Sequence, residues 1–116
     1  MGPDSDFVRR VHDIISLVPE GHIITYKDIA SFMGCKAYRA IGRACNKSPG
    51  MPIVPCHRVV SSDYRLHGFA QGLEDKKRLL AKEGISTVRI MFRGRVDYLI
   101  VNPEKHHCDL GDYDGF

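Results

Sequence analysis

The sequence lacks the marks of several protein classes. It has no tryptophan, and its four cysteines form no CxxC pair, so neither a zinc ribbon nor a dithiol redox site is indicated. No apolar run approaches the roughly 20 residues that a membrane-spanning helix needs, and no signal-peptide pattern follows Met1. Because domains usually contain about 100 to 200 residues, 116 residues predict one domain. We therefore expect an intracellular protein with reduced thiols, in the cytoplasm or, in a eukaryote, the nucleus.

Acidic residues are absent from one long stretch of the chain. Between Asp28 and Asp63 there is no Asp or Glu, whereas five Lys and Arg residues fall there. Residues 103–116 are acidic, which leaves residues 1–102 with a formal charge of +6. Such a basic body favours a polyanionic partner such as nucleic acid, although a merely solvated basic face has the same composition. We expect residues 1–102 to form the domain and residues 103–116 to be a flexible tail.

The first half of the chain has a helical pattern. Apolar residues recur at helical spacing over residues 5–18, and Thr25 followed by Asp28 is typical of a capping box at the start of a second helix. Gly34 is expected to end that helix, and a third helix with one apolar and one basic face is predicted over about residues 37–47. Two helices around a glycine-containing turn are typical of a helix-turn-helix, but also of ordinary helix packing.

The second half is predicted to be less regular. Three prolines within residues 48–56 exclude a helix and a central strand there. A helix is expected between Gly72 and Gly84, and two runs rich in β-branched residues, 87–92 and 96–101, indicate a small hairpin. The predicted fold class is mostly α with a small β-hairpin, of the winged helix-turn-helix type.

The segment Pro55-Cys56-His57-Arg58-Val59 has the composition of a reactive cysteine site. A cysteine reacts as its thiolate, which a nearby base and positive charge favour. Consecutive side chains usually point apart, so a contact between Cys56 and His57 needs a bend or a bridging water. The alternative is an inert buried cysteine. His106-His107-Cys108 is a poor chelating arrangement, and we expect no metal site.

Several short segments together resemble one family of DNA repair proteins. They are ITYKDIA around Tyr26, RAIGRA from Arg39, PCHRVV from Pro55, GLE from Gly72 and KEG around Glu83. Over about residues 7–85 the chain resembles the C-terminal, DNA-binding and active domain of O6-alkylguanine-DNA alkyltransferases. The resemblance implies transfer of an alkyl group from guanine O6 in duplex DNA to a cysteine, once per protein molecule, by a monomer without a cofactor or a membrane partner.

The resemblance also implies roles for individual residues. Cys56 would accept the alkyl group, His57 would act as a base through a water, and Glu83 would orient His57. Tyr26 would help to rotate a phosphate and would donate a hydrogen bond to the leaving guanine, while Arg39 would fill the space of the extruded base. Further implied residues are Ala37, Gly42, Arg43 and Asn46 for DNA binding, Cys45, Val59, Phe69 and Ala70 for the alkylguanine pocket, and Ser48 and Arg58 for support of the active-site loop.

Two positions depart from the family pattern, and other functions stay open. Ser48 stands where the family usually has asparagine, and Phe69 stands where a tyrosine is common, so loop support and substrate range are affected. The main alternative is an alkyltransferase-like protein that binds the lesion for another repair pathway without accepting the alkyl group. Such proteins commonly have tryptophan in place of the cysteine, whereas this chain keeps Cys56. A small helix-turn-helix regulator is a third possibility that would not need the PCHRV segment.

Overall fold

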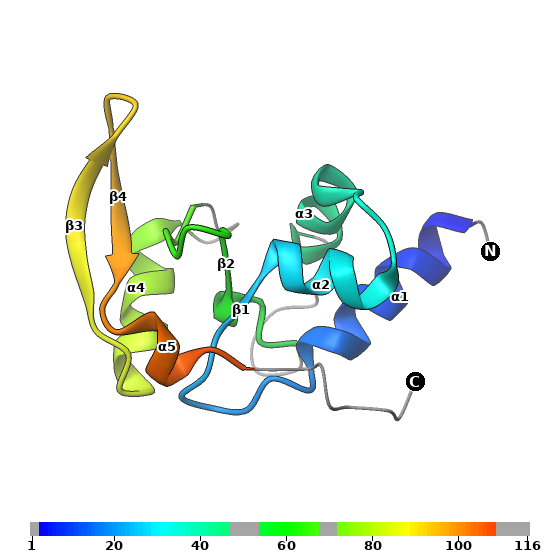
Figure 1. The fold of residues 1–116 in the computed structure, drawn as a ribbon, viewed down its shortest axis with the longest axis horizontal. Coiled ribbons are helices and arrows are strands. Elements are labelled where there is room, and N and C mark those ends of the chain that lie inside the picture. Colours follow the sequence, from blue (N-terminus) through cyan, green and yellow to red (C-terminus); the bar gives the residue numbers. More distant parts are fainter. Residues whose placement is uncertain (1–2, 47–53, 68–71, 109–116) are drawn as a thin grey trace.

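The computed structural model describes residues 3–46, 54–67 and 72–108 (Figure 1). Helices form most of the regular structure and a single antiparallel hairpin accompanies them in this part of the chain, so the predicted fold class is confirmed. In chain order the elements are α1 (Pro3–Ile15), β1 (Ile24–Thr25), α2 (Tyr26–Met33), α3 (Tyr38–Asn46), a 3₁₀ turn (Cys56–Arg58), β2 (Val59–Val60), α4 (Leu73–Lys82), β3 (Thr87–Phe92), β4 (Arg95–Ile100) and α5 (Pro103–His106).

The helix-turn-helix consists of α2 and α3, and its start and turn follow the local sequence. The Thr25 side chain accepts a hydrogen bond from the Asp28 backbone, and the Asp28 carboxylate accepts one from the Thr25 backbone, so the predicted capping box is confirmed. Gly34 ends α2 in the left-handed conformation, with φ of 69°. Helix α1 packs across both helices, and the His12 ring hydrogen-bonds the Ala44 carbonyl at 2.7 Å.

A two-residue parallel strand pair joins the two halves of the domain. Ile24 pairs with Val59 and Thr25 with Val60, which the sequence pattern did not reveal. Because successive side chains in a strand point to opposite faces, Ile24 and Val59 enter one core while Val60 enters the other. Figure 1 shows this pair between the α1–α3 group and the α4–hairpin group.

The buried apolar residues form two separate cores. The first core lies among α1, α2 and α3 and includes Cys45 and Cys56. The second lies between α4 and the hairpin, and its members are Ile23, Val60, Leu66, Leu80, Ile85, Tyr98 and Ile100. The strand pair and the 3₁₀ turn therefore lie at the border between the cores.

The hairpin is attached to the segment before α4 by backbone hydrogen bonds. Leu66 N donates to the Tyr98 carbonyl at 2.9 Å, and Ile100 N donates to the Tyr64 carbonyl at 3.0 Å. The two turn residues Arg93 and Gly94 have φ of 52° and 78°, the positive values that a tight two-residue hairpin requires. The hairpin begins its second strand at Arg95, one residue earlier than the sequence predicted.

The segment after residue 102 is ordered further than the sequence pattern predicted. Residues 103–106 form α5, and Cys108 N donates to the Ile23 carbonyl at 2.7 Å. His107 Nε2 lies 2.6 Å from the Asp28 carboxylate at the start of α2. Residues 103–108 thus differ from the flexible tail expected from residue 103, because they form these backbone and side-chain bonds despite their polar composition. Residues 109–116 lie outside the described part of the chain. Among the residues that are described, no helix is long and apolar enough to cross a membrane.

Candidate active site

The strand pair determines where the cysteine segment lies. Tyr26 follows β1 directly, and Cys56–Arg58 form the 3₁₀ turn that leads directly into β2. Parallel pairing of β1 and β2 therefore brings the start of the helix-turn-helix beside the cysteine turn. The Cys56 side chain is buried, with 7% of the residue exposed.

Glu83 binds both residues that follow the cysteine. Its carboxylate lies 2.6 Å from His57 Nε2 and accepts hydrogen bonds of 2.9 Å from Arg58 Nε and from a terminal Arg58 nitrogen. It also accepts a 3.0 Å bond from Gly21 N, while Arg58 donates a 2.7 Å bond to the Val18 carbonyl. The cysteine turn, the end of α4 and the loop after α1 are thereby fixed to one another.

This arrangement defines the protonation of His57. Burial lowers the pKa of His57 below its ordinary value of 6.5, and the hydrogen bond to Glu83 reverses this effect only in part. Burial alone would raise the pKa of Glu83, but bonds from Arg58, Gly21 and His57 bring it below its ordinary value. The pair at neutral pH is thus a neutral imidazole and a carboxylate. With Nε2 donating to Glu83, Nδ1 is the unprotonated ring nitrogen, and it has no hydrogen-bond partner among the described residues.

The Cys45 thiol and the Tyr26 phenol lie near Cys56. A hydrogen bond with Cys56, together with burial, raises the pKa of the Cys45 thiol, so Cys45 stays protonated and donates to the Cys56 sulfur. Burial likewise raises the pKa of Tyr26, and negative charge on either cysteine would raise it further. Both neighbours of Cys56 are therefore hydrogen-bond donors at physiological pH.

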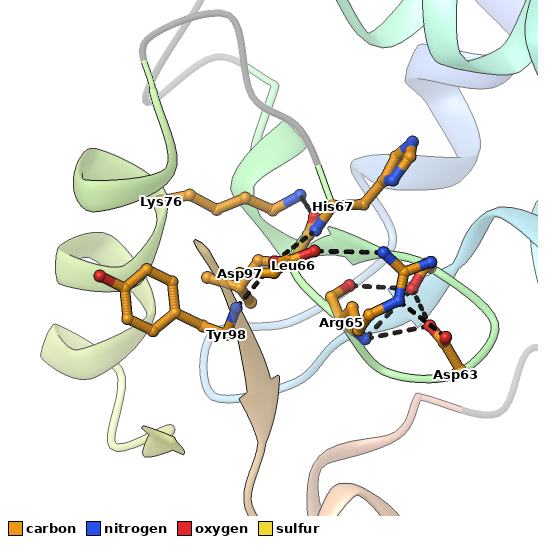
Figure 2. A network of polar contacts seen from close by, with 8 residues as sticks. Asp63, Arg65, Leu66, His67, Lys76, Asp97 and Tyr98 are labelled. Carbon is orange, nitrogen blue, oxygen red and sulfur yellow. Dashed lines mark hydrogen bonds and ion pairs between the residues drawn. The ribbon is translucent and has the colours of Figure 1, made fainter. Parts of the chain in front are cut away.

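Sequence reasoning missed Lys76, a fully buried lysine of α4. Its Nζ donates a 2.7 Å bond to the Leu66 carbonyl (Figure 2), and burial lowers its pKa from 10.5 to about 8. Negative charge on Cys45, Asp97 or Cys56 would raise that pKa, so the ammonium lies within electrostatic range of the cysteine site. Its position on α4, in register with the buried Leu80, was the available signal, since it places both on one helix face.

His67 is a second residue that sequence reasoning missed. It has φ of 70°, a left-handed value that is uncommon outside glycine, and its ring contacts the Tyr26 ring edge-on with centroids 6.1 Å apart. The Asp97 carboxylate accepts a 3.2 Å bond from His67 N. Figure 2 shows Asp97 between Lys76, the His67 backbone and Arg65.

Apart from Tyr26, which begins α2, the residues expected to bind DNA lie on α3 or just before it. Arg39 and Arg43 are exposed, whereas Ile41 and Ala44 of the same helix are buried, so the predicted division into a basic and an apolar face is confirmed. Ala37 and Gly42 are half-buried. Asn46 is the last residue of α3, and its side chain is outside the described part of the structure.

The expected pocket is described only in part. Cys45 contacts Cys56, and Val59 is fully buried in β2, so only its backbone could face a bound base. Ser48, Phe69 and Ala70 lie outside the described residues. Within residues 3–46, 54–67 and 72–108, no group of three or more His, Cys, Asp or Glu side chains is arranged to hold a metal ion.

Two solved structures that are similar to this chain are complexes with DNA. The structure of Mycobacterium tuberculosis OGT in complex with DNA is 38% identical to this chain, with a TM-score of 0.64. The match covers 67% of this chain and 49% of the OGT chain. *S. pombe* Atl1, in complex with DNA containing O6-carboxymethylguanine, has a TM-score of 0.76 over 90% of this chain and 96% of its own. Because Atl1 is only 24% identical, its likeness concerns the fold alone.

Sequence comparison gives the family. Methylated-DNA--protein-cysteine methyltransferase from *Methanosarcina barkeri* is 45% identical over 80 residues, which are 68% of this chain and 51% of the relative. The *Saccharomyces cerevisiae* protein of the same name is 40% identical, over 68% of this chain and 43% of its own. The chain thus spans about half the length of the curated relatives that it matches. The family model of the 6-O-methylguanine DNA methyltransferase DNA-binding domain matches residues 6–85, and the chain belongs to this family.

Proposed function

We propose that this chain repairs O6-alkylguanine in duplex DNA by a single transfer of the alkyl group to Cys56. The Cys56 sulfur forms a bond to the alkyl carbon as the bond between that carbon and guanine O6 breaks. The thiol proton passes through a water to Nδ1 of His57, and the electron pair of the broken bond stays with the guanine. The guanine anion then takes up one proton from solvent, and the imidazolium of His57 releases one to solvent. The products are an S-alkylcysteine and an unmodified guanine, so each protein molecule reacts once.

The neutral His57 beside the Glu83 carboxylate is the observation that carries this proposal. An unprotonated Nδ1 can accept a proton, and the carboxylate stabilises the imidazolium that results. The two groups belong to a single rigid unit with Arg58, so the imidazole needs no reorientation during the reaction.

Tyr26 and Lys76 complete the charge balance. The Tyr26 hydroxyl, which stays protonated, supplies a hydrogen bond to the leaving guanine and so limits its negative charge. The Lys76 ammonium acts at longer range, because a thiolate at Cys56 and a cation in the same buried region stabilise each other. Both groups act on charge that develops during the transfer.

The exposed arginines of α3 supply contact with the duplex. Arg39 enters the base stack where the damaged guanine leaves it, and Arg43 contributes attraction to the backbone. The half-buried Ala37 and Gly42 allow this helix to approach the groove closely.

The test is transfer of a methyl group to one identified cysteine. The protein is incubated with a duplex containing O6-methylguanine, and its peptides are analysed by mass spectrometry. We expect one added methyl group on the Cys56 peptide, none in Cys56→Ala, and normal transfer in the matched thiol control Cys35→Ser, whose cysteine is only half-buried. A methyl group on another cysteine, or transfer by Cys56→Ala, contradicts the proposal.

A second function stays open from the sequence analysis, and the likeness to Atl1 concerns the fold alone and does not decide between the two. Under this second function the protein binds the lesion without accepting the alkyl group. The same experiment separates the two functions, since tight and lesion-selective binding without any gain in mass supports the binding protein. The presence of Cys56 beside a neutral histidine favours transfer.

A further inference from the structure

We propose that the β3–β4 hairpin and the loop of residues 61–67 form a second DNA-binding surface, which holds backbone phosphates next to the lesion site. The surface is an open cleft of about 560 Å³, whose lining includes Arg65, His67, Phe92, Arg93, Arg95 and Asp97. Most of it comes from the hairpin, which lies beyond the 6–85 region that the family model matches. The inference rests on the proposed DNA binding of the chain and extends it to another part of the molecule.

The charge of the cleft fits a polyanion. Three arginines and one aspartate line it, so its net charge is +2 with His67 neutral. The carboxylate of Asp97 is buried and already accepts bonds from Arg65 and from the backbone of His67 and Tyr98. It is therefore satisfied inside the protein and does not repel an anion at the open side of the cleft.

The arginines divide into one that is fixed and two that are available. Arg65 pairs with Asp63 at 2.7 Å and with Asp97 at 3.2 Å, and its guanidinium carbon lies 3.6 Å from the centre of the Phe92 ring. It thereby fastens the end of the hairpin to the loop. Arg93 and Arg95 are exposed, and neither forms an ion pair with any described residue. The guanidinium carbon of Arg93 lies 5.2 Å from the centre of the Phe92 ring, which leaves its nitrogens without an acidic partner among the described residues. These two side chains remain to bind phosphate, for which the guanidinium fork is well suited.

The position of the cleft points to DNA rather than to a small anion. His67 lines the cleft and also contacts the Tyr26 ring, so the cleft begins next to a residue of the proposed active site. In Figure 1 the hairpin turn and α3 extend toward the same side of the molecule. A duplex held by α3 would therefore continue toward the hairpin, and an open cleft along its course would meet the phosphates that flank the lesion.

The anchoring of the hairpin gives this surface a fixed geometry. Hydrogen bonds join Leu66 to Tyr98 and Ile100 to Tyr64, and Tyr98 Oη donates to Glu74 at the start of α4. The buried Tyr98 and Ile100 belong to the same core as Leu80 of α4. The arginines at the turn are thus carried on a rigid support, which lowers the entropy lost when they bind.

The experiment compares the salt dependence of DNA binding in two charge-matched variants. Arg93→Asn with Arg95→Gln removes the available cations, and the resulting Asn-Gly pair suits the turn, so the hairpin is expected to fold. The control, Lys82→Gln with Lys105→Gln, removes the same charge from exposed residues at the end of α4 and on α5, away from the hairpin turn in Figure 1. Dissociation constants are measured for an O6-methylguanine duplex and for its undamaged counterpart over a range of KCl concentrations.

The expected result is a change confined to the hairpin variant. The slope of log affinity against log salt should fall in magnitude by about 1.8, corresponding to two lost phosphate contacts at about 0.9 each, for damaged and undamaged duplex alike. An unchanged slope, or an equal change in the control, overturns the inference. The inference is also overturned if the hairpin variant binds inorganic phosphate more weakly but binds DNA as tightly as the wild type does. Failure of the wild-type protein to transfer methyl to Cys56, with this pattern intact, would instead count only against the proposed repair reaction.

Discussion

His57 and Glu83 are 26 positions apart in the chain, yet His57 Nε2 and a Glu83 carboxylate oxygen are separated by only 2.6 Å. The same carboxylate holds Arg58 through two of its nitrogens, so one acidic side chain fixes both the His57 ring and the cysteine turn. Under the proposed function, stability and reactivity are therefore coupled at Glu83.

Replacing Glu83 with Gln should reduce both properties. The substitution leaves the half-buried Arg58, whose side chain is 14% exposed, without its counter-charge, and breaking such a pair costs at most about 3 to 5 kcal/mol of unfolding free energy. Denaturant unfolding measures this loss, and single-turnover kinetics should show slower methyl transfer. Asp75→Asn is the control, because its pair with Arg78 is exposed and contributes at most about 1 kcal/mol. Similar losses in both variants would contradict the central position of Glu83.

The transfer rate should be insensitive to pH down to about the ordinary pKa of histidine. Because burial lowers the pKa of His57 below 6.5, the imidazole remains a neutral base at pH 6.5 and gains a proton only at lower pH. Single-turnover rates measured between pH 5 and 8 should therefore fall only on the acid side of this value. The unfolded chain binds this proton more readily than the folded protein, so stability should also decline as pH falls below 6.5. A rate that already declines from pH 8 to 7 would indicate a different base.

Lys76 should give the protein a distinct pH dependence on the alkaline side. Its pKa is about 8 in the folded protein against 10.5 ordinarily, so the unfolded chain binds more protons between these values. The unfolding free energy of the wild type, minus that of Lys76→Met, should rise from pH 8 to 10.5 by about 3 kcal/mol. Urea unfolding of both proteins across this range tests it. A constant difference would mean that the lysine is not a buried cation.

Arg39→Ala should separate repair from general DNA binding. If Arg39 fills the gap left by the extruded guanine, its loss should slow methyl transfer much more than it weakens binding to undamaged duplex. Arg43→Ala, which alters the same exposed face of α3, should mainly weaken binding and lower the salt dependence by about 0.9. Equal effects of Arg39→Ala on transfer and on binding would argue against the intercalating role.

Local signals in the sequence predicted local structure well. Thr25, Asp28 and Gly34 specify the limits of α2 through short-range hydrogen bonds and backbone conformation, and these limits are confirmed. The pairing of Ile24 with Val59 is different, since two-residue strands carry no recognisable alternation and their partners are far apart in the chain. The order of residues 103–108 likewise depends on distant partners, Ile23 and Asp28.

The site was predictable only where a motif marked it. PCHRV identified Cys56 and His57, but Glu83 was selected by family resemblance, because nothing in its local sequence indicates which side chain it meets. Lys76 was missed since a lysine in a charged helix is ordinarily exposed, and its helical register with Leu80 was a weak signal beside that general tendency. His67 gave no signal because its contact with Tyr26 depends on a left-handed backbone conformation that sequence pattern does not encode.

The bonds from Glu83 to His57, Arg58 and Gly21 also affect how the protein is made. A nascent chain that ends at Lys82 already contains the imidazole, the guanidinium and the Gly21 amide, but not the carboxylate that bonds to all three. These three bonds can therefore form only after residue 83 has been added. Fraying of the last turn of α4 in the finished protein would release the same three groups together.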